Sequence, residues 1–176
     1  MKVNYVKNGI ITLALAVPLM FSFNLTTSAE LTNSGSPDAG ISVKSPDNLN
    51  DTWKTPINEG IIAWNGTPTP VTIGYLSSST NTITAASYPD TWYGLNSQWF
   101  FPKYRYTIQL NSRTIVRDAT NFSNFVKGAT VHEFGHSFFL KDNPNTTKAS
   151  IMKYSNDFNT VTTPRQYDID DVNTAY

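Results

Sequence analysis

The two histidines of this 176-residue chain lie in one pentapeptide, His132-Glu133-Phe134-Gly135-His136. In an α-helix, residues four positions apart lie on the same face, so both imidazoles can reach one metal ion. Glu133 is turned about 100° from His132, which places it beside the ion rather than on it. There its carboxylate can take a proton from a zinc-bound water. The spacing H-E-x-x-H therefore predicts a hydrolytic zinc site, and two histidines that share a helix by chance are the alternative.

A third zinc ligand must come from elsewhere, because a catalytic zinc ion usually has three protein ligands and a water. The chain has no cysteine, no third histidine and no glutamate after Glu133, so the candidates downstream are Asp142, Asp157, Asp168, Asp170 and Asp171. Asp142 can turn back toward the ion if the helix ends between Phe139 and Lys141, and Pro144 favours such an end. Asp142 is the predicted ligand, and an acid in solvent at a helix C-terminus is the alternative.

Together these residues resemble a known zinc signature. The segment 132–142 is similar to the long motif of the metzincin metallopeptidases, H-E-x-x-H-x-x-G-x-x-H/D, in which snapalysin-like members use aspartate as the third ligand. Ser150-Ile151-Met152-Lys153-Tyr154 resembles the Met-turn S-x-M-x-Y of astacin-like and serralysin-like enzymes. Asp170-Asp171-Val172 is similar to the acidic C-terminal helix of matrixins, where such an aspartate has a structural role.

The resemblance implies roles for single residues. His132, His136 and Asp142 would bind one catalytic Zn²⁺, and Glu133 would be the general base. Met152 would form an apolar floor beneath the metal, although plain core packing also explains it. Tyr154 would support the transition state as a second catalytic residue, or it is a surface side chain.

One residue departs from the family pattern. Phe139 stands where metzincins have the glycine that lets the chain turn and deliver the third ligand. A left-handed conformation costs a residue other than glycine about 1–2 kcal/mol. We therefore leave open whether Phe139 takes this turn or whether Lys141 or Asn143 does, and asparagine tolerates positive φ better than most residues.

The expected fold class is α+β: a metzincin-like zincin domain with a twisted mixed sheet backed by helices and an active-site helix under an open cleft. The expected function is that of a secreted zinc-dependent endopeptidase, a monomer whose protein or peptide substrate lies along an edge strand at 104–110. Calcium is compatible with the resemblance, without assigned ligands. The alternatives are a degenerate, non-catalytic zinc-site binding protein, which Phe139 favours, and a zinc hydrolase of cell-wall peptide or amide bonds.

Composition and the N-terminal segment limit where the protein can act and which classes of partner it can bind. The 13 basic and 13 acidic residues cancel, which argues against nucleic acid, and the absence of cysteine excludes disulfides. Residues 1–29 are typical of a signal peptide, with an uncleaved membrane anchor as the alternative, so a secreted protein without a membrane partner after cleavage is expected. Residues 30–51 are expected to be a flexible arm or a short pro-segment, and residues 52–176 the catalytic domain.

Local patterns predict the elements that position these residues. A helix is expected from Thr55 to Asn65, with strands at 71–76, 82–88 and 104–110. The aromatic stretch 89–102 is interpreted as a small core rather than a substrate wall. The motif helix is expected within 121–140, and a last helix is expected to begin at Thr163 with a capping box.

Overall fold

The computed structural model describes residues 31–176, so the predicted signal peptide lies outside the described residues. Along the chain the elements are β1 (Gly40–Val43), α1 (Asp51–Asn65), β2 (Thr72–Tyr75), β3 (Thr82–Ala86), β4 (Gly94–Trp99), β5 (Arg105–Asn111), α2 (Ser112–Asp118), α3 (Phe122–Ser137) and α4 (Gln166–Ala175). Among residues 31–176, every helix is too short or too polar to cross a bilayer.

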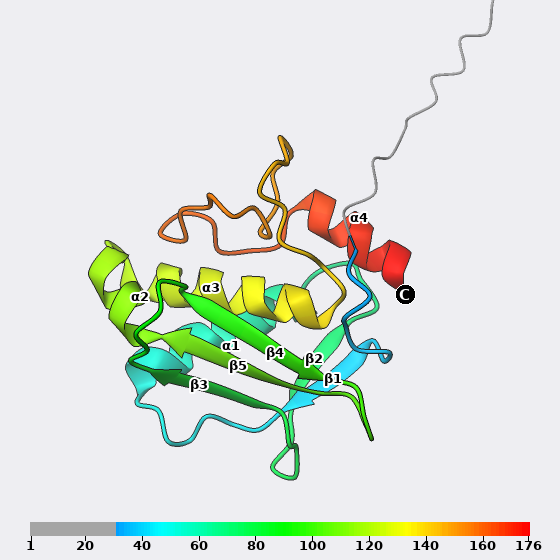
Figure 1. The fold of residues 1–176 in the computed structure, drawn as a ribbon, viewed down its shortest axis with the longest axis horizontal. Helices are drawn as coiled ribbons and strands as arrows, with labels where there is room; N and C mark the ends of the chain where they lie inside the picture. Colours follow the sequence, from blue (N-terminus) through cyan, green and yellow to red (C-terminus); the bar gives the residue numbers. More distant parts are fainter. Residues whose placement is uncertain (1–30) are drawn as a thin grey trace, which may run out of the picture.

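The strands form two small sheets. β1 and β2 pair in parallel, with Gly40 opposite Thr72. β5 is the centre of the other sheet, parallel to β3 and antiparallel to β4. β4 is therefore an edge strand, as Figure 1 shows. These pairings correct the expectation of one twisted mixed sheet with its edge at 104–110, because both sides of β5 are already paired.

Helix α3 lies at the centre of the molecule. It packs against α1 on one side and against β4 and β5 on the other (Figure 1). The indole of Trp64 in α1 donates a hydrogen bond of 2.8 Å to the carbonyl of Val131 in α3, inside the core. From β5, alternate residues Tyr106, Ile108 and Leu110 are fully buried, as a strand with one covered face requires. The motif helix is thus held on two sides by the main hydrophobic core.

The predicted elements are present, but several boundaries differ. α1 begins four residues before Thr55, with Pro56 inside the helix, and it ends at Asn65 before Gly66 as predicted. The predicted strands contain β2, β3 and most of β5, and the predicted motif helix contains α3. α2 was not expected. α4 begins at Gln166 rather than at Thr163, because its capping box uses Arg165 and Asp168.

The stretch before α1 is more ordered than its composition indicates. Leu31 forms a bridge with Leu140, and the amides of Thr32 and Ser36 donate to the carbonyls of Phe139 (2.8 Å) and Ser137 (2.7 Å). The expectation of a flexible arm is therefore wrong for these residues. Composition gave no signal for this contact, because the segment is held mainly through its backbone. Whether the segment is removed as a pro-peptide stays a prediction.

Candidate metal centre

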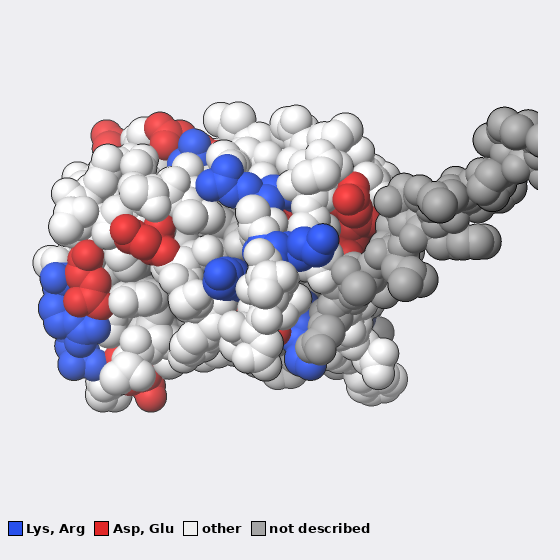
Figure 2. All heavy atoms as spheres, turned by 90° about the horizontal axis from the view of Figure 1, so that it is seen from above, with Lys and Arg blue, Asp and Glu red and all other residues white. Residues whose placement is uncertain are grey.

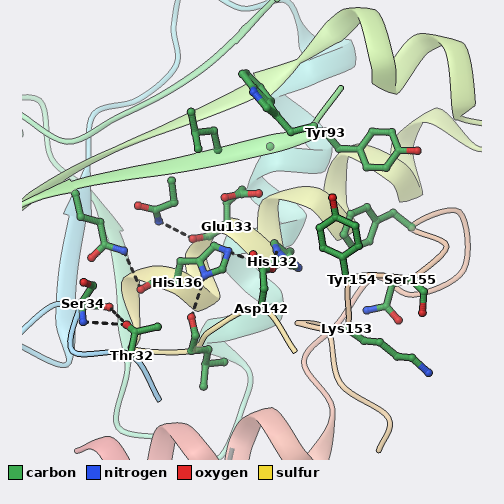
Figure 3. A pocket seen from close by; sticks show the side chains of 18 of the residues that line it. Thr32, Ser34, Tyr93, His132, Glu133, His136, Asp142, Lys153, Tyr154 and Ser155 are labelled. Atoms are coloured by element: carbon green, nitrogen blue, oxygen red, sulfur yellow. Dashed lines mark hydrogen bonds and ion pairs between the residues drawn. The ribbon is translucent and has the colours of Figure 1, made fainter. Parts of the chain in front are cut away.

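Both motif histidines project from α3 into one cleft. The helix begins after Asn121, whose side chain accepts a hydrogen bond from the amide of Asn124. His132 and His136 lie one turn apart, with ring centroids 4.9 Å from each other, and Figure 3 shows both beside Asp142. The helical spacing therefore does what the sequence predicted: it directs two imidazoles to one point.

The chain turns immediately after α3 to bring Asp142 back. The helix ends at Ser137, and the amides of Phe138 and Leu140 both donate to the carbonyl of Gly135. Phe139 has a φ of 67°, in the left-handed region. Phe139 itself therefore takes the turn, and neither Lys141 nor Asn143 replaces it. Its ring lies 5.7 Å from that of Tyr176, a contact that helps to offset the backbone strain.

Three donor atoms converge at this turn. Oδ1 of Asp142 lies 3.0 Å from Nε2 of His132 and 3.7 Å from Nε2 of His136. The three potential ligand atoms all lie within 4.8 Å of one another, a spread that one ion can bridge. Two imidazole nitrogens and a carboxylate oxygen are a donor set that zinc accepts in catalytic sites. The residues present therefore fit a zinc ion.

The far sides of both imidazoles are fixed by the backbone. Nδ1 of His132 lies 3.0 Å from the carbonyl of Ile151, and Nδ1 of His136 lies 2.9 Å from that of Leu140. Because a carbonyl only accepts, each Nδ1 must carry the proton and donate it. In a neutral ring this leaves the lone pair on Nε2, which faces the cleft, as a ligating histidine requires.

The protonation of the metal-free site follows from burial and charge. Burial opposes a charge on His132, but the neighbouring Asp142 and Glu133 outweigh it and raise the pKa of His132 to about 9. Burial, together with the charge on His132, lowers the pKa of His136 to about 4. Burial raises the pKa of Glu133 to about 7. A proton on His132 thus balances the charge of Asp142, and a bound cation would replace that proton.

Edge strand β4 positions Glu133, which the sequence did not reveal. The amide of Asn96 donates to the carbonyl of Glu133 (2.6 Å) and to the hydroxyl of Ser137 (2.8 Å). Gln98 donates to the carbonyl of His136 at 3.1 Å. Gly94 lies so close to Glu133 that an added Cβ would stand 2.6 Å from its Cγ. Residues 89–102 were interpreted as a small core and not as a strand, so the contacts of β4 with α3 were not predicted.

A buried turn at residues 150–152 packs against α3 next to the candidate metal centre. Met152 is buried, and its sulfur packs against Gly135 of α3. Asp168 of α4 accepts hydrogen bonds from the hydroxyl of Ser150 (2.5 Å) and the amide of Ile151 (2.8 Å). Burial raises the pKa of Asp168, while these bonds lower it. Asp168 is thus the acid of α4 that holds the turn, a role that the sequence alone did not indicate.

The cleft above the ligands has a volume of about 770 Å³. Its walls include Trp92, Tyr93 and Leu95, and the ring of Phe158 lies edge to face with that of Tyr93 at 6.3 Å. Tyr154 also lines it, but its side chain is 78% exposed, so it lies at the rim (Figure 3). Its predicted catalytic role stays a prediction. The face seen in Figure 2 consists mostly of uncharged residues, consistent with the 15% charged composition.

Comparisons with known proteins give no family for this chain. No family model matches the sequence, and no curated protein is similar to it. A solved structure described as "GM1 bound form of the ECX AB5 holotoxin" has a partly similar fold, with a TM-score of 0.47 and 14% identity over 77% of this chain and 78% of that chain.

These findings correct the assignments that depended on resemblance. No family model and no curated protein supports the motif match, and the similar structure is described only as a GM1-bound toxin. The metzincin assignment, the metzincin-like fold class, the zinc endopeptidase function and the description of the chain as a hydrolase and protease therefore do not stand. At this TM-score and identity the likeness gives this chain no function in their place. The function must be argued from the site itself.

Proposed function

We propose that this chain is a zinc-binding protein in which His132, His136 and Asp142 hold one ion at the base of the cleft. The observation that carries the proposal is the double restraint on the histidines. Each Nδ1 is bonded to a backbone carbonyl, so each Nε2 is presented to Asp142. An accidental pair of histidines has no reason to show this arrangement on both rings.

The site would leave a coordination position open toward the cleft. Three protein ligands are one fewer than the four of a closed structural zinc site. Zinc bound here would supply a Lewis acid that lowers the pKa of a water to about 7. Glu133 lies next to the ligands, and we propose that its carboxylate takes up the proton from such a water. The contact with Gly94 and the hydrogen bond from Asn96 hold the Glu133 segment in place for this role.

The cleft favours a ligand that combines an oxygen donor with an apolar group. A carbonyl or carboxylate oxygen would complete the coordination of zinc, and the adjoining rings of Tyr93 and Phe158 would contact an apolar side group. We further propose that the protein acts outside the cell, as the predicted signal peptide implies. The described residues contain no second cluster of metal-ligating side chains, so we assign no calcium ligands.

Zinc affinity, measured by competition with a chromophoric chelator, tests the proposal. The native chain should bind one zinc ion. Asp142→Asn should weaken binding by more than the roughly 10–100-fold that loss of an outer partner costs. Asp170→Asn, which removes the same charge from an exposed site on α4, should leave the affinity unchanged, and Glu133→Gln should keep the ion. Equal affinities for Asp142→Asn and Asp170→Asn would refute the assignment of the ligands.

The same ion should stabilise the fold. At a free zinc concentration 100-fold above its Kd, mass action adds about 2.7 kcal/mol to the free energy of unfolding. In a domain of this size each kcal/mol raises Tm by about 2–4 °C, so zinc should raise Tm by about 5–11 °C. Asp142→Asn should abolish this shift. A native chain whose Tm does not respond to zinc would contradict the proposed function.

A further inference from the structure

The turn between β4 and β5 exposes a group of aromatic side chains that the metal cleft does not use. We call residues Trp99–Arg105 the hairpin tip. Phe101 is 87% exposed, Phe100 51% and Trp99 45%. In Figure 1 this hairpin extends beyond the body of the sheet. Side chains of this size normally bury their surface, so three of them together in solvent mark an interaction site.

The tip is braced rather than loose. The ring of Phe100 lies 5.6 Å from that of Tyr104, which in turn lies 6.0 Å from the buried ring of Tyr106. The guanidinium of Arg105 lies 5.6 Å from the ring centre of Trp99. These contacts connect Phe100 to the core through Tyr104 and Tyr106, and they pair Trp99 with Arg105 across the hairpin. Because the tip is already ordered, binding through it would cost little conformational entropy.

The charges of the tip select the kind of partner. Lys103 and Arg105 lie among the aromatic residues, and the sequence has no acidic residue between Asp90 and Asp118. Aromatic rings with adjacent cations are the combination that suits the interface of an anionic membrane. There the rings occupy the boundary between headgroups and acyl chains, and the cations meet lipid phosphates.

We propose that the hairpin tip binds the surface of an anionic lipid bilayer, with Phe100 and Phe101 inserted at the interface and Lys103 and Arg105 against the headgroups. β4 connects the two sites, since Gln98 bonds to the backbone of His136 while Trp99 begins the tip. Membrane binding would therefore hold the cleft close to the lipid surface. The proposal is independent of the zinc site.

Sedimentation with lipid vesicles tests this inference. The protein should be expressed from the full chain and recovered from the culture medium, so that its natural processing is kept. It should bind vesicles of phosphatidylcholine with one quarter phosphatidylglycerol at least about tenfold more tightly than vesicles of phosphatidylcholine alone. Salt at 0.5 M should weaken the binding, because it screens the attraction of the two cations.

Two variants and one control distinguish vesicle binding by the hairpin tip from nonspecific adsorption of the protein. Phe100→Ser with Phe101→Ser, and separately Lys103→Glu, should each weaken vesicle binding about tenfold or more. Ile62→Ser removes an apolar side chain of α1 that is 66% exposed and should have no effect. Absence of vesicle binding by the native protein, or binding that the double variant retains, would overturn the proposal. A dimer of the native protein that the double variant abolishes would reassign the tip to a protein contact and would likewise overturn it.

Discussion

Replacing Asp168 with alanine should destabilise the fold and weaken the metal site together. The carboxylate of Asp168 accepts three hydrogen bonds, from the hydroxyl of Ser150 (2.5 Å) and from the amides of Ile151 (2.8 Å) and Arg165 (2.7 Å). Ser150 and Ile151 are buried, so alanine would leave two buried donors without an acceptor. Each unsatisfied donor costs about 1–3 kcal/mol, and the lost cap of α4 adds about 1.

The expected loss in the free energy of unfolding is therefore about 3–7 kcal/mol, measured by urea denaturation. For a domain of this size the corresponding fall in Tm is about 6–28 °C. Asp170→Asn on the same helix is the control and should change stability by less than about 0.5 kcal/mol, as is usual for exposed sites. A loss below about 1 kcal/mol for Asp168→Ala would refute the view that this carboxylate holds the turn.

We expect Asp168→Ala to weaken zinc binding because Asp168 holds Ile151, which orients His132. The carbonyl of Ile151 fixes Nδ1 of His132, and its amide is held by Asp168. Loosening this residue should weaken zinc binding by about 10–100-fold, the range for outer partners of a ligating histidine. The measurement is made well below the Tm of the variant, so that unfolding does not contribute. Unchanged zinc affinity in a folded Asp168→Ala variant would show that the turn does not orient His132.

Two further changes test the packing around the site. Gly94→Ala should cost about 1–3 kcal/mol of stability, because the new methyl group meets Glu133, and the cost should largely vanish in a Glu133→Ala background; equal costs in both backgrounds would contradict the contact. High pH tests the buried tyrosines: burial raises the pKa of Tyr104 to about 12 and also raises that of Tyr106, whereas tyrosine in the unfolded chain ionises near pH 10. Unfolding then releases protons above pH 10, so the urea midpoint should fall as the pH rises from 10 to 12, and a midpoint that stays level over this range would contradict this burial.

The geometry of the candidate metal centre was largely predictable because its proposed ligands are close in sequence. His132 and His136 are fixed by helical spacing, and the structure brings Asp142 to them as predicted. The supporting residues that were not predicted lie far from the histidine motif along the chain. Asn96, Gln98 and Gly94 meet α3 only through the pairing of β4 with β5, and Asp168 reaches the turn only through the packing of α4. Such contacts depend on how the elements pack against one another, and residue periodicity within one element does not predict that packing.

The sheets were harder to predict than the helices for a related reason. The segments 71–76, 82–88 and 104–110 alternate like strands, but alternation does not tell which strands pair. β1 pairs with β2 across the whole of α1, and the polar composition of the segment before α1 concealed it. The weak pattern of β4 has a physical cause. Its inward residues, Asn96 and Gln98, are polar because they bond to the backbone of α3 rather than to an apolar core.

Phe139 shows how a residue can keep a conformation that its side chain disfavours. Its φ of 67° carries strain, while its ring packs against Tyr176 and Gly35. A pair of variants separates the two effects, since Phe139→Ala and Phe139→Gly both lose the ring, but only glycine relieves the strain. The left-handed penalty of about 1–2 kcal/mol, less the entropic cost of glycine of about 0.5–1 kcal/mol, predicts that Phe139→Gly is the more stable variant, by up to about 1.5 kcal/mol in urea denaturation. If Phe139→Ala proved the more stable, the turn would not be left-handed in solution, and the delivery of Asp142 to the histidines would need another path.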